Sequence, residues 1–213
     1  ARDGLQYAGI PGSVYNDAGS KNDYTDDFSC RGRWVNYLAG GSTAYPEGPG
    51  LNIPVNMSVA FHSDAGCHPT DKLVGTFMFY TIKDDDKETT YPSGGDRICN
   101  RDFADFIQTQ IVEDIRQTMM PTWQKRHLMH QSMSETRNPK VPSTIIELLS
   151  HHNYYDMTFG LDPKFKFIAS RAIYKGMLRF IHQTTGTPYV VQPLPVQQMN
   201  ISYANNDSLH ITW

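Results

Sequence analysis

Two residues stand where chemistry could take place, each at or inside an apolar run. His62 closes the run over residues 53–62, and Glu147 stands inside a second run over residues 142–149, so both runs predict buried strands. In an open α/β sheet, functional side chains gather beyond the carboxyl ends of the strands. An imidazole there could act as a metal ligand or a base. A carboxylate among apolar residues needs a partner, and its pKa can rise into the range of a general base.

A purely structural interpretation of the same two residues is also open. His62 would then only make a hydrogen bond that supports the fold, and Glu147 would face water from an edge strand. His151 and His152, just after the second run, would form a polar turn. The sequence contains no HExxH, P-loop, GxGxxG or GxSxG motif, so no short motif decides between the two interpretations.

Two pairs of histidines have spacings that a metal site could use. His62 and His68 are six residues apart, across a turn. His127 and His130 are three residues apart and would share one face of a helix, which is also what a solvated polar helix would show.

Two further polar residues are candidates for substrate binding. Asp64 could orient His62 or bind substrate. Arg137 could hold a substrate carboxylate, or it could pair with Glu135 or with an acidic loop.

The elements that must position these residues alternate between strands and helices. Residues 73–82 are β-branched and aromatic, which predicts a strand, and residues 84–88 after it are interpreted as a solvated turn. Residues 101–119 carry apolar side chains at four-residue spacing, which predicts an amphipathic helix. Residues 163–183 predict a second long helix, with Asp162 as N-cap and Pro163 in its first position. The alternation indicates an α/β fold, with a mixed or parallel open sheet flanked by helices.

The two ends of the chain have a different character. Residues 1–33 are rich in turn formers and predict a long ordered loop, followed by a short helix over residues 31–39. After Gly186, prolines space an extended segment, and residues 199–203 and 209–213 predict two short strands around a turn. A lone hairpin is marginal in water. We therefore expect residues 1–187 to form the α/β domain, and residues 188–213 to be a linker and the first strands of a β-sandwich module that this chain does not complete.

Composition excludes several classes of function. The 213 residues are ordinarily globular, with 19 Lys and Arg against 22 Asp and Glu, a formal net charge of −3. No basic excess exists to attract a nucleic-acid backbone or an anionic membrane, so we expect no nucleic-acid partner. No apolar run is long enough for a transmembrane segment, and no signal peptide is visible.

The cysteines and the first residue give weaker information. Cys30, Cys67 and Cys99 are widely spaced and form no CxxC pair, which excludes a dense disulfide framework and leaves one bridge plus a free thiol open. The chain begins with Ala1 rather than Met, so we expect a mature, processed or cut form.

The order of these parts resembles the zinc-dependent N-acetylmuramoyl-L-alanine amidases. Residues 58–66, SVAFHSDAG, are similar to the SIHAN segment of that family, and a strand beginning with Gly-Thr-Phe follows in both. Residues 141–153, VPSTIIELLSHHN, are similar to the family's PAVLVELGFISN segment. Asp156 and Leu161 then lead into a helix like the family's closing helix, and the resemblance covers about residues 53–183.

The resemblance implies an activity and a role for two residues. The family holds one zinc ion with two His and one Glu, and a separate Glu acts on the metal-bound water. By motif, His62 corresponds to the second zinc His and Glu147 to the catalytic Glu. The expected reaction is hydrolysis of the amide between the lactyl group of N-acetylmuramic acid and L-alanine in peptidoglycan. The cofactor would be Zn²⁺, and the location the periplasm, the cell surface or the outside of a bacterium.

The sequence departs from the family in its first part. The family's first zinc His lies in a Gly-His-Gly-Gly turn, and its zinc Glu follows on a helix, but residues 1–52 contain no His and only one Glu, Glu47. Either this chain is the C-terminal part of a longer catalytic domain, inactive alone and completed by a missing N-terminal segment, or its site is degenerate. The alternatives are a non-catalytic module that binds cell wall or glycan, and another carbohydrate-active enzyme such as a polysaccharide lyase that uses Arg137 and Glu147.

Overall fold

A computed structural model describes residues 1–16, 21–66, 70, 72–196, 198–205 and 207–212. The expectations for Cys67 and His68 lie outside these residues. Cys30 and Cys99 both carry free thiols.

Four strands form one mixed sheet in the order β1-β4-β2-β3. They are β1 (Ser58–Asp64), β2 (Thr76–Tyr80), β3 (Lys125–His130) and β4 (Ser143–Ser150). β1 runs parallel to β4, and β3 runs parallel to β2, whereas β2 and β4 are antiparallel. The expected open, mixed sheet is therefore confirmed, with β4 in its interior and β1 at one edge.

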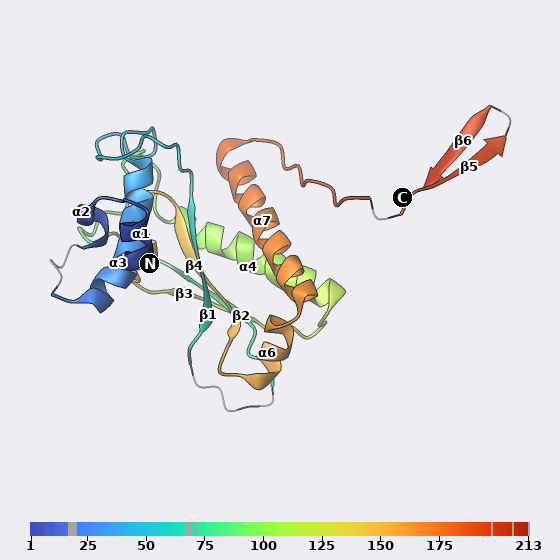
Figure 1. Ribbon diagram of the computed structural model, residues 1–213, viewed down its shortest axis with the longest axis horizontal. Coiled ribbons are helices and arrows are strands. Elements are labelled where there is room, and N and C mark those ends of the chain that lie inside the picture. Colours follow the sequence, from blue (N-terminus) through green and yellow to red (C-terminus); the bar gives the residue numbers. More distant parts are fainter. Residues whose placement is uncertain (17–20, 67–69, 71, 197, 206, 213) are drawn as a thin grey trace.

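Helices cover both faces of the sheet. One side carries α3 (Asp23–Ala39), and the other carries α4 (Cys99–Thr118) and α7 (Pro163–Thr185), as Figure 1 shows. The two long helices on the second side confirm the helices expected from apolar spacing. Asp162 caps α7 by accepting a hydrogen bond from the backbone N–H of Lys164 at 2.8 Å, and Gly186 ends the helix with a left-handed backbone.

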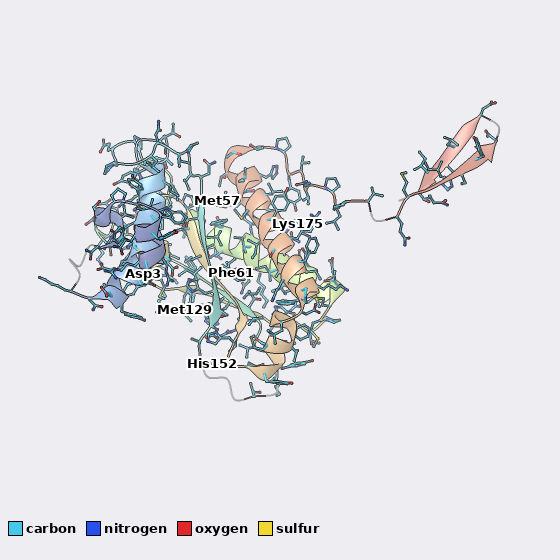
Figure 2. The ribbon with its side chains drawn as sticks, in the orientation of Figure 1. Asp3, Met57, Phe61, Met129, His152 and Lys175 are labelled. Atoms are coloured by element: carbon cyan, nitrogen blue, oxygen red, sulfur yellow. The ribbon has the colours of Figure 1, made fainter. Side chains whose placement is uncertain are left out.

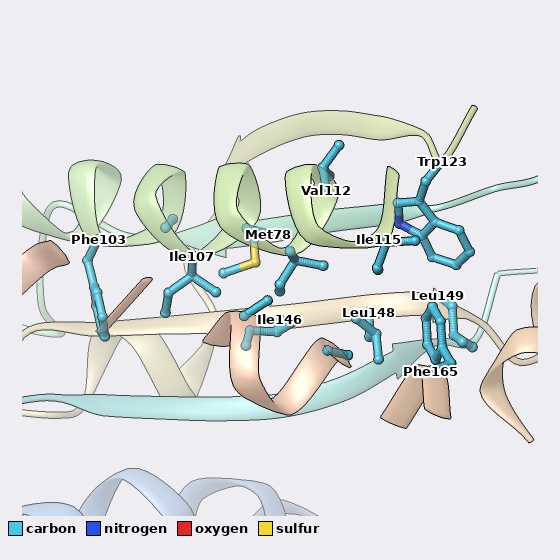
Figure 3. Packing of buried hydrophobic residues seen from close by; sticks show 14 of the residues in the cluster. Met78, Phe103, Ile107, Val112, Ile115, Trp123, Ile146, Leu148, Leu149 and Phe165 are labelled. Carbon is cyan, nitrogen blue, oxygen red and sulfur yellow. The ribbon is translucent and has the colours of Figure 1, made fainter. Parts of the chain in front are cut away.

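The larger core lies between the sheet and the pair α4 and α7. Alternate residues of β4 face opposite sides of the sheet, so Ile146 and Leu148 pack into this core. They meet Phe103 and Ile107 from α4 and Phe165 from α7 (Figure 3). The other face of β4 belongs to a smaller apolar cluster formed by Ile145, Phe77 and Phe79.

The close approach of α4 and α7 depends on Gly176. A methyl group at Gly176 would lie 2.7 Å from Cα of Ile107, a backbone atom that cannot rotate away. We expect Gly176→Ala to lower the free energy of unfolding by about 1–3 kcal/mol. Gly4 in α1 (Arg2–Tyr7) is the matched control, because nothing lies within 4 Å of its added methyl group.

The free energy of unfolding of both glycine variants can be measured by chemical denaturation. Gly4→Ala should leave the free energy of unfolding unchanged or raise it by up to about 1 kcal/mol, as expected for an open helical position. Equal values for the two variants would contradict the tight crossing of α4 and α7.

The N-terminal region differs from the expected loop. Residues 1–33 include α1, α2 (Gly12–Tyr15) and the first part of α3, which begins at Asp23. The Asx side chains mistaken for turn signals act instead at a helix start, because Asn22 accepts a hydrogen bond from the backbone N–H of Thr25 at 3.0 Å. The expected helix over 31–39 is thus only the second half of α3.

The strand boundaries also needed correction. β1 starts at Ser58, five residues later than expected, because residues 53–57 are not paired in the sheet and Pro54 has no N–H to donate. Of the strand expected over residues 73–82, only Thr76–Tyr80 forms a strand, β2. Gly75, just before it, adopts a positive φ of 78°, which a regular strand does not have. The helix considered for His127 and His130 is wrong: both lie in β3, where residues three apart face opposite sides.

Besides α1 and α2, two further short helices were not expected. They are α5 (Ser134–Arg137) and α6 (Tyr154–Gly160), which flank β4 in sequence. None of the helices in the described ranges is long and apolar enough to cross a membrane.

The C-terminal strands form the expected hairpin. β5 (Asn200–Asn205) and β6 (Ser208–Thr212) pair antiparallel and stand apart from the α/β body (Figure 1).

Candidate functional site

His62 and Glu147 lie side by side on neighbouring strands. They are register partners in the parallel pair β1 and β4, so their side chains project from the same face of the sheet. The antiparallel strand on the other side of β4 places Phe77 opposite Glu147. The sheet thus brings together two residues that are 85 positions apart in the sequence.

The Glu147 side chain lies next to the smaller apolar cluster, because it shares a face of β4 with Ile145 and pairs with Phe77. Its Oε2 atom is buried and has no hydrogen-bond partner among the described residues. Burial raises the pKa of Glu147, the charge of His62 opposes this shift, and the negative charges of Asp64 and Glu135 add to it. A raised pKa makes the ionised carboxylate a stronger proton acceptor than an ordinary Glu side chain.

His62 is held by a residue that sequence reasoning did not assign to the site. Its Nε2 atom lies 3.0 Å from Oε1 of Glu135 on α5. This hydrogen bond raises the pKa of His62, against the opposing effect of burial. Arg31 on α3 donates to the same Glu135 oxygen at 3.1 Å and also to Asp27 at 3.1 Å. No sequence signal marked Glu135, because its contact with His62 spans 73 residues and depends on how α5 packs against the sheet.

Asp64 lies at the same end of the sheet and is paired with a cation. Its Oδ2 atom accepts a hydrogen bond from Arg126 at 2.9 Å. The Arg126 guanidinium in turn lies 4.1 Å from the centre of the Phe77 ring. The register of β1 shifts between His62 and Asp64, and Asp64 then pairs with Ser150. Arg126 therefore brings a positive charge near Glu147 that the sequence did not reveal.

The other candidates are not gathered at this site. Arg137 forms an ion pair with Asp85, and so pairs with the acidic loop, which was one of the two alternatives to substrate binding. His127 stacks on Phe77, and His130 stacks on Tyr80 of β2.

A cavity of about 410 Å³ adjoins His62 on the edge of the sheet. Phe61 and Ser63 of β1 form one wall, and residues from the end of β4 and from α6 and α7 form the rest. Phe61, labelled in Figure 2, exposes 61% of its surface. At the rim, Ser63 Oγ and His151 Nδ1 lie 2.9 Å apart. Leu148 and Phe165 in this lining belong to the larger core, so the cavity lies on the α7 side of the sheet. The Glu147 side chain points to the opposite side, toward the smaller cluster, and is not part of the cavity lining.

The described residues do not form the complete metal site that the resemblance predicts. Within the described parts of the chain, no group of three His, Cys, Asp or Glu side chains is arranged to hold an ion. His62 Nε2 is engaged by Glu135, and the guanidinium of Arg31 already neutralises that carboxylate. These residues by themselves do not form a three-ligand zinc site.

Comparison with known proteins relates the fold to one group of enzymes. No family model and no curated protein matches the sequence. Among solved structures, an N-acetylmuramoyl-L-alanine amidase from Clostridium difficile 630 superposes with a TM-score of 0.53 at 15% identity, over 80% of this chain and 79% of that one. The CwlD amidase from Clostridioides difficile, solved in complex with the GerS lipoprotein, gives a TM-score of 0.52 at 18% identity, over 79% and 70%. The chain has the fold of the N-acetylmuramoyl-L-alanine amidases.

Proposed function

We propose that this chain hydrolyses the amide between the lactyl group of N-acetylmuramic acid and L-alanine in peptidoglycan. The observation that carries the proposal is the pairing of His62 with Glu147 on one sheet face, in a fold shared with amidases. Cell-wall substrate implies a periplasmic, surface or secreted location. The proposed partner is therefore a muropeptide.

Glu147 is proposed as the group that moves the proton. Ionised, it accepts a proton from the attacking water, and protonated, it returns that proton to the leaving amine of L-alanine. The residue is half-buried, and its carboxylate is raised in pKa by burial, which supports this role. Zn²⁺ remains the proposed cofactor on the basis of the resemblance, although the described residues do not complete its ligand set.

The domain division is likewise a proposal. We assign residues 1–187 to the α/β domain and residues 188–213 to a linker and a β-module. In the hairpin, Ile201 pairs with Ile211 and Tyr203 pairs with Leu209, so the four apolar side chains share one face. All four expose 45% or more of their surface. Such a face supports packing against further β-structure.

A second function has one observation in its favour. The absence of a three-ligand group among the described residues would suit a non-catalytic module that binds muropeptide or glycan through the same face. Hydrolysis and binding differ in whether the substrate is converted.

The purified chain, incubated with a defined muropeptide, tests the proposal by mass spectrometry. Hydrolysis releases a free stem peptide that begins with L-alanine and leaves an intact lactyl group on the sugar. Metal analysis, with and without added Zn²⁺, accompanies the assay. Binding without conversion would favour the module, and an unsaturated uronic sugar in the product would indicate a lyase.

The pH dependence of hydrolysis should reflect the raised pKa of Glu147. Because the base must be ionised, kcat/KM is expected to fall, as pH decreases, at a higher pH than an ordinary Glu side chain would give. Asp64→Asn removes a negative charge that raises this pKa, so the acidic limb should move to lower pH. An acidic limb that stays in place in Asp64→Asn would contradict the assignment of Glu147 as the base.

A further inference from the structure

The hydrogen bond between His62 and Glu135 restricts the imidazole to one arrangement. A neutral imidazole carries its proton on either Nδ1 or Nε2, and the nitrogen without the proton holds the lone pair. An ionised carboxylate can only accept hydrogen bonds. At 3.0 Å from a carboxylate oxygen, Nε2 must therefore be the nitrogen that carries the proton.

Glu135 is built to stay ionised in this position. Its side chain exposes 13% of its surface and accepts from Arg31 at 3.1 Å as well as from His62. The Arg31 guanidinium is always charged and bonds to the same carboxylate oxygen as His62, so it favours the ionised form of Glu135. Arg31 is itself anchored by Asp27 within α3, so the carboxylate is held from a rigid helix.

We propose that Glu135 is a positioning residue that fixes the tautomer of His62, keeping the proton on Nε2 and leaving Nδ1 as the nitrogen with the free lone pair. The contact of His62 with Glu135 is the kind of hydrogen bond that orients histidines in active sites and sets which ring nitrogen reacts. Its consequence for rate rests on the proposed function, whereas the tautomer itself does not.

The tautomer can be observed directly by ¹⁵N NMR of the histidine rings in the full chain, above the pH at which His62 loses its charge. The wild type should show a protonated Nε2 and an unprotonated Nδ1. Glu135→Ala should convert His62 to a mixture of tautomers. Glu135→Gln should restore the wild-type tautomer, because Arg31 can only donate and so holds the amide oxygen, not the NH2 group, at the position that accepts a hydrogen bond from Nε2–H.

Two variants separate positioning from general support of the fold. Arg31→Met breaks the link between Arg31 and Glu135 but keeps the carboxylate, so it should lower stability while the tautomer of His62 is retained. Glu113→Gln is the matched control for loss of a carboxylate, because Glu113 is half-exposed on α4 and its nearest cation is 4.0 Å away. It should change neither the tautomer nor the rate.

With muropeptide as substrate, Glu135→Ala should reduce kcat by about 10–100-fold, with partial recovery in Glu135→Gln. A proton on Nδ1 of His62 in the wild type, or an unchanged tautomer in a folded Glu135→Ala, would overturn the proposal. If the tautomers behave as expected while no variant, including the wild type, hydrolyses muropeptide, then the proposed function fails and the positioning role stands.

Discussion

Replacing Glu147 with Gln is expected to abolish hydrolysis of the muramoyl amide while the fold remains intact. The amide side chain has nearly the same shape but cannot take up a proton from water, and a positioned general base typically contributes about 10²–10⁴-fold to a rate. Release of stem peptide from muropeptide, measured by mass spectrometry over time, should fall by that factor. Binding of the muropeptide, measured by calorimetry, should be retained.

The same substitution should not destabilise the protein at neutral pH. The folded-state pKa of Glu147 is raised, chiefly by burial, so ionising this group opposes folding at any pH above its ordinary pKa. Gln removes that penalty, so Glu147→Gln should unfold at an equal or higher denaturant concentration at neutral pH. The difference should vanish as the pH falls below the pKa of an ordinary Glu side chain, where the carboxyl is neutral in both states.

The exposed variant Glu113→Gln controls for loss of a carboxylate in general and should keep full activity. An unchanged hydrolysis rate in Glu147→Gln would remove Glu147 from the mechanism. A lower stability at neutral pH would instead indicate that the ionised carboxylate has a stabilising partner.

Elements with strong local signals could be predicted from the sequence. The helix α7 carries its own start in Asp162 and Pro163, and β4 is a short, mainly apolar run that follows Pro142, so both elements are predicted to within about two residues. The strand β3, KRHLMH, has charged residues in place of the β-branched ones that mark strands, and only its pairing with β2 makes it a strand. The first half of α3 was predicted as a loop. Asn and Asp side chains form hydrogen bonds to the backbone both in turns and at helix starts, so these residues do not distinguish the two.

The sequence could predict candidate site residues only one position at a time. His62 and Glu147 are candidates because each ends or interrupts an apolar run, and the parallel register of β1 and β4 makes the two residues neighbours. Glu135 and Arg126 could not be found in this way, because their contacts with His62 and Asp64 span 73 and 62 residues. Such contacts depend on the order of the strands in the sheet. The sequence pattern shows that strands and helices alternate, but it does not determine that order.

The largest expected loss of stability comes from Asp156, at the carboxyl end of the sheet near the site. Its buried carboxylate accepts three backbone hydrogen bonds, from Val74 at 2.8 Å, Gly75 at 3.2 Å and Ser150 at 2.9 Å. It thereby joins α6 to the segment before β2 and to the end of β4. Asp156→Ala would leave three donors without partners, and each buried donor left in this way costs about 1–3 kcal/mol. We expect a total loss of about 3–5 kcal/mol, measured by chemical denaturation.

Asp162→Ala is the matched control for this loss. Asp162 also accepts a backbone hydrogen bond, from Lys164 at 2.8 Å, but it does so at an exposed helix start, where the freed N–H can bond to water. Its replacement should cost about 1 kcal/mol. Asp156→Asn should fall between the two, because one amide oxygen can replace only part of the carboxylate. If Asp156→Ala and Asp162→Ala lower the free energy of unfolding by similar amounts, the end of β4 keeps its geometry without Asp156. The position of Glu147 would then be set by strand pairing in the sheet and not by Asp156.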